Sequence, residues 1–211
     1  MPFGPDVSLS AGPRADEFVL RPITAADARL DCEAVMDSRE YLRQWEQSTW
    51  PEDDFTVADN QSDLVDLERW NSENLAFTYT ILDPSESRCL GCVYIFPPDA
   101  TFLSRSEFNP TAEGAGEWSD IDAAVCHWVR RREMDAGMDA TVLTELGEWI
   151  RQERGFDRIV FVTNDQFGAQ TDLFQRFGFG REFKNRQPDA EGTHFGCGPQ
   201  ASKAKPMSTQ P

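Results

Sequence analysis

The alternation of apolar and polar positions is clearest in the second half of the chain. Residues 122–130 hold a short run of bulky side chains, which suits a packed strand. Apolar residues then recur at the spacing of an amphipathic helix, at Met138, Val142, Leu146 and Trp149. Residues 158–164 are mostly apolar and too short a run for a helix, so they predict a buried strand. Two strands joined by a helix at this spacing predict a parallel pair with a right-handed crossover.

A second helix follows that strand and ends at a glycine. Leu173, Phe174 and Phe177 form its apolar set. Gly178 stands where the end of a helix needs a left-handed backbone, and Phe179 can fold back onto the last turn. The alternation of strands and helices therefore continues to residue 179.

The first half of the chain follows similar patterns. They predict a strand at 18–23, a helical stripe from Leu30 to Trp45 that ends near Trp50-Pro51, a helix at 60–74, and a hairpin of strands at 77–82 and 89–96. Thr24 is a suitable cap for the first helix.

Three segments lie outside this pattern. Residues 97–121 form a long polar connection with several prolines and glycines, and a loop of that length is either disordered or a functional lid. Residues 1–16 and 198–211 have the composition of flexible tails. We therefore expect one domain over residues 17–197, interrupted by the 97–121 loop.

Charge narrows the class of protein. The 211 residues carry a formal net charge of −17, with three lysines against seventeen arginines. Nucleic-acid binding requires basic surface, and no apolar run approaches the roughly 20 residues that span a bilayer. The N-terminus lacks the basic start and apolar core of a signal peptide, so we expect a cytoplasmic protein without nucleic-acid or membrane partners. The acidity either keeps the protein soluble or favours cationic substrates such as amines.

One pair of cysteines has the spacing of a redox or metal site. Cys89 and Cys92 enclose Leu-Gly, but no second pair follows, and the two histidines are scattered. The surrounding sequence LGCVYIF reads as a strand in which Gly91 lets the backbone turn in. We therefore interpret the pair as structural and expect no metal.

The order strand–loop–helix–strand–helix–Gly-Phe over residues 122–179, with the opening LRPIT-x-x-DA at residues 20–28, resembles the GNAT superfamily of acetyl-CoA-dependent N-acetyltransferases. The resemblance implies an α/β fold with a mixed, mostly antiparallel sheet, a central parallel strand pair and flanking helices. It also implies transfer of acetyl from acetyl-CoA, as co-substrate, to a primary amine of a small molecule or a protein. The alternative is a catalytically inactive GNAT-like module that binds CoA or regulates a partner.

The family holds the acetyl-CoA pyrophosphate on backbone amides where its central helix begins, a position favoured by the helix dipole. The resemblance sets this loop at residues 134–139, where Gly137 fits the family pattern and Met134 and Asp139 depart from it. A carboxylate facing a pyrophosphate costs on the order of several kcal/mol before screening. Either Asp139 turns onto its own helix amides, or Arg130–Arg132 neutralise the phosphates from the side.

The resemblance implies a set of cofactor contacts around this loop and at the ends of the two central strands. They are Trp128, Val129, Arg130, Arg131, Arg132, Met134, Asp135, Ala136, Gly137, Met138, Asp139 and Asn164.

The catalytic groups are less fixed by the sequence. Family members often use a tyrosine on the last helix as the acid for the departing thiolate, and that position holds Phe174 here. The base is often a carboxylate near the central strands, and the candidates by location are Asp120, Asp122 and Glu133. We interpret His127, within the first of these strands, as a packed side chain. We expect a monomer or a homodimer.

Overall fold

The computed structural model describes residues 3, 7, 10–100, 103, 107–111, 116–154, 156–186 and 194–199. Their strands form one sheet in the order β1-β2-β3-β5-β6-β8-β7-β4. Among the described strands, only β5 and β6 pair in parallel. The strands are β1 (Val19–Pro22), β2 (Phe77–Leu82), β3 (Cys89–Phe96), β4 (Glu107–Pro110), β5 (Ala123–Val129), β6 (Ile159–Asn164), β7 (Phe179–Arg186) and β8 (His194–Pro199). This is the mixed sheet with a central parallel pair that the sequence predicted.

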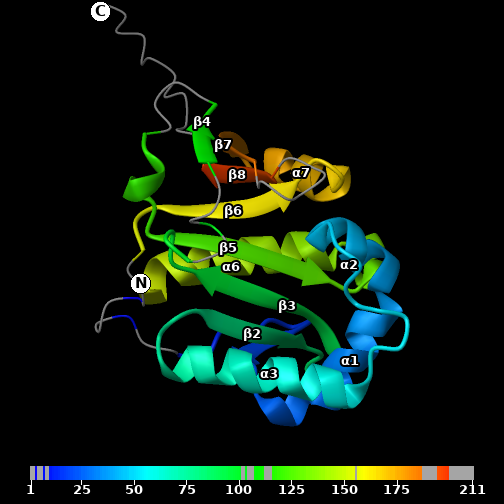
Figure 1. The fold of residues 1–211 in the computed structure, drawn as a ribbon. Coiled ribbons are helices and arrows are strands. Elements are labelled where there is room, and N and C mark those ends of the chain that lie inside the picture. Colours follow the sequence, from blue (N-terminus) through cyan, green and yellow to red (C-terminus); the bar gives the residue numbers. More distant parts are fainter. Residues whose placement is uncertain are drawn as a thin grey trace, which may run out of the picture.

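Helices cover both faces of the sheet (Figure 1). On one face lie α6 and α7, and on the other lie α1, α2 and α3, with α3 packed against α1 and β2. The helical elements are η1 (Ala25–Asp27), α1 (Ala28–Asp37), α2 (Arg39–Glu46), α3 (Val57–Ser72), η2 (Trp118–Asp120), α5 (Arg131–Asp135), α6 (Met138–Arg154) and α7 (Gly168–Arg176). None of the described helices is long and apolar enough to cross a membrane.

The alternation of side chains along β5 explains why helices are needed on both faces. Val125 and Val129 point to the core under α6, where they meet Leu146. Cys126 and Trp128 point to the opposite face. Each face of the strand is therefore apolar, as expected for a central strand that is covered on both sides.

The parallel pair is short. β5 and β6 are in register at three positions, where Ala123, Ala124 and Val125 face Ile159, Val160 and Phe161. Beyond Val125, β5 continues to pair with β3, and beyond Phe161, β6 continues to pair with β8. The two strands therefore diverge toward their carboxyl ends, as Figure 1 shows. We call the wedge between them the splay.

Several elements differ from the sequence prediction. The helical stripe from Leu30 to Trp45 is two helices, because Ser38 leaves the helical conformation between α1 and α2. Phe177 is 44% exposed rather than apolar core, because α7 ends one residue before it. Gly178 has the expected left-handed backbone, with φ of 79°. The ring of Phe179 lies 6.3 Å from that of Phe174, so it does fold back onto α7.

The predicted tails and long loop contain regular structure. β4 and η2 lie within residues 97–121, and β4 pairs with β7 at the edge of the sheet. Residues 101–102, 104–106 and 112–115, which belong to the same predicted loop, lie outside the described residues. β8 runs two residues past the expected domain end at Cys197. In the predicted N-terminal tail, Phe3 is buried and stacks on Phe77 at 5.0 Å.

Candidate active site

The splay is closed on the α7 side by a polar contact. The Gln170 side chain, on α7, donates from Nε2 to the main-chain carbonyl of His127 in β5 at 3.0 Å. Both residues are buried, with 3% of Gln170 and 1% of His127 exposed. The contact lies beyond the last β5–β6 ladder pair at Val125, so a side chain occupies a place where a parallel sheet would have main-chain hydrogen bonds.

The α7 face of the splay, which we call the polar wedge, contains buried polar atoms that have no partner within the described residues. They are Nδ1 and Nε2 of His127 and Oε1 of Gln170. The imidazole lies about edge-on to Phe161, with ring centroids 6.0 Å apart, and burial lowers its pKa to about 4. His127 is therefore a packed neutral side chain, as the sequence suggested. Because unpaired buried polar atoms are costly, this wedge is a candidate binding site for a ligand with amide groups.

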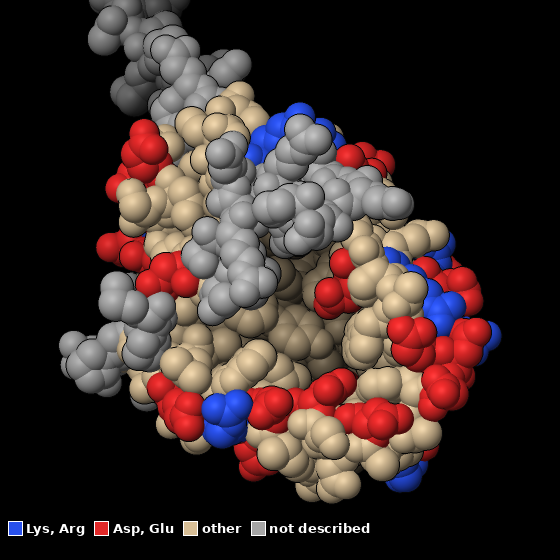
Figure 2. Space-filling model, in the orientation of Figure 1, with Lys and Arg blue, Asp and Glu red and all other residues tan. Residues whose placement is uncertain are grey.

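A cavity of about 530 Å³ lies on the opposite face of the splay. Figure 2 shows it as a hollow in the middle of the viewed face, with acidic side chains along its edges. Its walls come from α2, α3, β3, β5, β6 and neighbouring loops, and the lining residues are Trp45, Glu46, Trp50, Asp63, Asp66, Leu67, Trp70, Tyr94, Phe96, Leu103, Cys126, Val162, Thr163 and Asn164. β5 and β6 therefore separate two candidate sites, the polar wedge on one face and this aromatic and acidic cavity on the other.

Glu46 is the acidic residue of the cavity that belongs to α2. It is the last residue of that helix, where the helix dipole is unfavourable for a carboxylate. Enclosure by the protein raises its pKa, although the side chain itself remains open to water in the cavity. The described residues provide no hydrogen bond or ion pair to this carboxylate. An unpaired acid in an unfavourable place is a feature of functional sites, and nothing in the local sequence distinguishes Glu46 from the other acids of the chain.

Asn164 holds the end of α2 against the end of β6. Its Nδ2 donates to the main-chain carbonyls of Gln44 at 3.1 Å and Trp45 at 2.7 Å, and its Oδ1 accepts from Gln166 N–H at 3.0 Å. Asn164 lines the cavity, but both ends of its amide are already occupied. These contacts fix the end of α2 just before Glu46. The contact of Asn164 with the cofactor stays a prediction.

The predicted cofactor loop contains an unpredicted short helix, α5, before α6 begins at Met138. Gly137 joins them with φ of 87°. The Asp139 carboxylate accepts from the Ala140 N–H at 3.0 Å, and burial raises its pKa. Of the two arrangements that the sequence left open, the structure has Asp139 turned onto its own helix amides. The carboxylate therefore competes for the donors that a pyrophosphate would need.

The arginines before this loop face carboxylates. Arg130 is buried and lies 3.4 Å from Asp37. The neighbouring Arg131 and Arg132 lie 3.5 Å from Asp135 and 3.3 Å from Glu133, respectively.

The other residues predicted to contact the cofactor are spread over different surroundings. Met134 and Met138 are half-buried against the core, and Trp128 donates from Nε1 to the Tyr94 hydroxyl at 3.4 Å on the cavity side. Val129 is core, and Asp135 and Ala136 are exposed.

The carboxylates that the sequence suggested as bases lie away from the cavity. Asp122 accepts from the Arg158 N–H at 2.8 Å, and Asp120 lies 3.5 Å from the Arg158 guanidinium. Both stand at the start of β5, where β5 and β6 are still paired. Glu133, on α5, forms ion pairs with Arg88 and Arg132. The structure does not bring these three residues together, and none of them lines the cavity.

Phe174, at the position of the family tyrosine, is ordinary core. It is 1% exposed, and its ring lies 5.6 Å from Phe161. Two tyrosines on other elements also lie beside the diverging part of β5. Tyr94 lines the cavity, and Tyr41 packs on Phe167 at 4.6 Å between α2 and α7. The sequence gave no signal for either, because each comes from an element remote from the cofactor loop.

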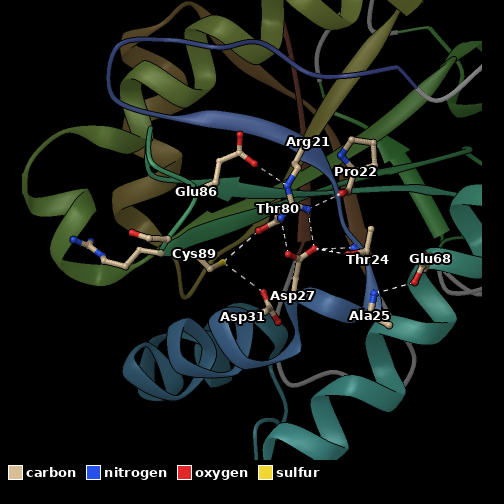
Figure 3. Close-up of polar contacts among 12 residues, drawn as sticks. Arg21, Pro22, Thr24, Ala25, Asp27, Asp31, Glu68, Thr80, Glu86 and Cys89 are labelled. Carbon is tan, nitrogen blue, oxygen red and sulfur yellow. Dashed lines mark hydrogen bonds and ion pairs between the residues drawn. The ribbon is translucent and has the colours of Figure 1, made fainter.

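The Cys89–Cys92 pair lies in β3, as the strand interpretation required. A register irregularity where Leu82 faces Cys89 brings both thiols to the buried side, where they donate to Asp31 Oδ1 at 3.6 and 3.2 Å. Figure 3 shows Cys89 between Asp31 and Thr80, beside the ion pair of Arg21 with Asp27. Ligand atoms of Asp31, Cys89 and Cys92 lie within 4.8 Å of one another. The absence of a metal therefore stays a prediction.

No sequence model of a protein family matches the chain, and no curated protein sequence matches it. Several solved structures are similar to the chain in fold. The ribosomal-protein-S5-alanine acetyltransferase from Vibrio fischeri has 17% identity and a TM-score of 0.66, covering 93% of this chain and 100% of its own. RimJ from Mycobacterium smegmatis, in complex with CoA-disulfide, has 16% identity and a TM-score of 0.63, covering 92% and 88%. The microcin C7 self-immunity acetyltransferase MccE, in complex with acetyl-CoA and AMP, has 12% identity and a TM-score of 0.64, covering 89% and 94%. The chain therefore has the GNAT acetyltransferase fold.

Proposed function

We propose that this protein is an N-acetyltransferase that moves an acetyl group from acetyl-CoA to a primary amine. The observation that carries the proposal is that two candidate sites lie on opposite faces of the sheet at the splay of β5 and β6. The buried polar wedge of His127 and Gln170 lies on one face, and the cavity with Glu46 lies on the other. A thioester and an amine that approach the splay from opposite faces would be held close together, which is a large part of what such a transfer requires.

The wedge fits the amide-containing arm of acetyl-CoA. Unpaired atoms of His127 and Gln170 would gain partners, and the His127 carbonyl could exchange Gln170 for an amide N–H of the ligand. The amides at the start of α6 would take the pyrophosphate once Asp139 releases Ala140. Arg176, near enough to Asp139 to lower its pKa, is a nearby cation for the phosphates. RimJ and MccE are structures with CoA or acetyl-CoA bound, which supports this choice of co-substrate.

In the cavity, Glu46 is the proposed general base. Acetyl-CoA would supply the acetyl group as a thioester. The amine nitrogen attacks the thioester carbonyl, an N–C bond forms, the C–S bond breaks, and the CoA thiol leaves with one proton. Glu46 takes the proton that the amine loses, directly or through water, and its raised pKa makes it a better base than an ordinary carboxylate. Phe174 cannot donate a proton, so the thiolate receives its proton from water or from another group.

The test is an acetyl-transfer assay that follows release of the CoA thiol with a panel of primary amines. Glu46→Gln should lower kcat by about 10²- to 10⁴-fold, the usual contribution of a general base, while acetyl-CoA binding persists. Asp122→Asn and Glu133→Gln test the two bases that sequence location suggested, and Asp120→Asn tests the third. A large loss in one of these variants, with Glu46→Gln active, would move the base away from Glu46.

A second candidate is a GNAT-shaped module that binds CoA without chemistry. Asp139 on the α6 amides and Phe174 in the tyrosine position favour it. Under both proposals, acetyl-CoA at one hundred times its dissociation constant should stabilise the protein by about 2.7 kcal/mol. Stabilisation by acetyl-CoA without thiol release for every amine in the panel would support the module. The absence of both effects would exclude both proposals.

A further inference from the structure

The charges that line the cavity are all negative. Three acids and no Lys or Arg occur among its described lining residues. Asp66 is neutralised by Arg69, at 2.9 Å. Glu46 and Asp63 have no ion pair within the described residues. Both side chains are exposed to the water of the cavity, and the protein around them still raises the pKa of each by partial desolvation. Repulsion from Asp59 and Asp66 raises the pKa of Asp63 further. The cavity therefore presents two carboxylates without a countercharge, and these would attract positive charge on a ligand.

These two acids come from different walls. Glu46 ends α2, and Asp63 lies in the first half of α3. Aromatic side chains are the largest group in the remaining lining, namely Trp45, Trp50, Trp70, Tyr94 and Phe96. Trp45 and Tyr94 pack with ring centroids 6.1 Å apart, and Tyr94 stacks on Phe96 at 6.2 Å. Aromatic faces attract cations and also cover methylene groups, so this lining suits an alkyl chain with ammonium groups.

The lining offers little to other kinds of amine. A peptide N-terminus presents amide N–H and C=O groups that need partners. The uncharged polar residues able to provide them are Thr163 and Asn164, besides the Tyr94 hydroxyl and the tryptophan N–H groups, and the Asn164 amide is already engaged. An amino acid would bring its carboxylate close to Glu46 or Asp63. A simple monoamine would neutralise one of the two acids and leave the other unpaired.

We propose that the acceptor is a small linear amine with at least two ammonium groups, a diamine or polyamine. One ammonium stays charged beside Asp63, and the other gives up its proton at Glu46 and is acetylated. This inference rests on the proposed acetyl transfer and names its substrate class. Asp63 is then a specificity-determining residue, because it contacts the part of the acceptor that does not react.

The experiment compares cadaverine with pentylamine, which has the same carbon chain and one ammonium fewer. With acetyl-CoA and the full chain, kcat/KM for cadaverine should exceed that for pentylamine by at least about fivefold, the size of a modest ion pair and cation–π contact. Asp63→Asn should reduce this ratio to about twofold or less. The matched control is Asp172→Asn, an exposed acid on α7 on the other face of the sheet, which should keep the ratio. Added salt should also reduce the ratio, since the attraction is screened.

Melting temperatures measured with each amine in the absence of acetyl-CoA test amine binding separately from acetyl transfer. Cadaverine should stabilise the protein more than pentylamine, and Asp63→Asn should remove the difference. If this binding preference holds without any acetyl transfer, the cavity assignment stands and the proposed function fails. If acetyl transfer occurs with equal kcat/KM for both amines, or if an alanine tripeptide amide is the better acceptor, the inference is wrong and the proposed function stands. Equal melting temperatures with both amines would also overturn the inference.

Discussion

The carboxamide of Gln170 and the main-chain carbonyl of His127 are hydrogen-bonded across the wedge between β5 and β6, at 3.0 Å. The side chain from α7 thus donates to a main-chain carbonyl of β5 at a position where β5 no longer pairs with β6. The contact joins residues 43 positions apart in the chain, and both residues are buried.

Replacing Gln170 with Ala should destabilise the protein by about 1 to 3 kcal/mol, because the buried His127 carbonyl would lose its side-chain donor. Chemical denaturation measures the change. Gln175→Ala is a matched control on the same helix, where the side chain is exposed, and it should change stability by less than about 0.5 kcal/mol. Equal stability of the Gln170→Ala variant and the natural chain would show that the closure of the splay does not depend on this contact.

His127 should make the stability depend on pH. Its pKa is about 4 in the folded protein, against about 6.5 for an ordinary imidazole. The unfolded chain therefore takes up the proton first, so the stabilisation is complete above about pH 6.5 and is lost as the pH falls toward 4. Between pH 7 and pH 5 the natural chain should lose about 2 kcal/mol more than a His127→Leu variant does. Parallel stability–pH curves for the two proteins would mean that the imidazole is charged or hydrated in solution.

Asp139→Asn should bind acetyl-CoA more tightly, by about tenfold or more, because it removes a negative charge from the proposed pyrophosphate site. Isothermal titration calorimetry measures the dissociation constant. The matched control is Asp157→Asn, which removes an exposed acid between α6 and β6 and should leave the dissociation constant unchanged. Weaker binding by Asp139→Asn would mean that this carboxylate does not face the phosphates.

Two glycine substitutions near α6 should have opposite effects on stability. Gly137 has φ of 87° and open space where a side chain would begin, so Gly137→Val introduces backbone strain rather than a clash. It should cost about 1 to 2 kcal/mol and abolish acetyl-CoA binding while the fold persists. Gly147 lies inside α6, where an added methyl group meets only the end of the Arg151 side chain at 3.3 Å. Gly147→Ala should therefore stabilise the protein by about 0.5 to 1 kcal/mol, as judged by denaturation midpoints.

The purified protein should contain substoichiometric zinc by elemental analysis. Asp31 already accepts hydrogen bonds from both thiols, and the pKa of Cys92 is well above its usual range because of its contact with Cys89, burial and the Asp31 charge. A metal would have to displace these thiol protons. One zinc per chain that survives chelation, and that is lost in a Cys92→Ser variant, would show that the cluster is a metal site.

Local sequence patterns determined the central part of the fold. The predicted limits of β2 and β3 agree with the structure, and the apolar runs at 122–130 and 158–164 became the parallel pair β5 and β6. The helix between them begins at Met138, and the left-handed backbone lies at Gly178. These features depend on periodicity and backbone conformation within a few residues, which the sequence contains directly. The part of the sheet beyond β6 was not predictable in this way. There β8 lies between β6 and β7, and β4 forms the edge by pairing with β7, so these strands depend on partners far away in the chain.

The candidate site depended on the tertiary structure. The family resemblance predicted a cofactor loop at residues 134–139 and identified Asp139 as a departure from the family pattern. Two arrangements around that carboxylate remained open, and the structure shows it accepting from the Ala140 N–H. Glu46 and Asp63 had no distinguishing sequence signal among the many acids of the chain. Their importance arises because α2, α3 and the diverging strands enclose one cavity, and enclosure raises the pKa of both. The sequence thus determined the scaffold through short-range periodicity, whereas the chemistry of the cavity was decided by burial and charge among residues far apart in the chain.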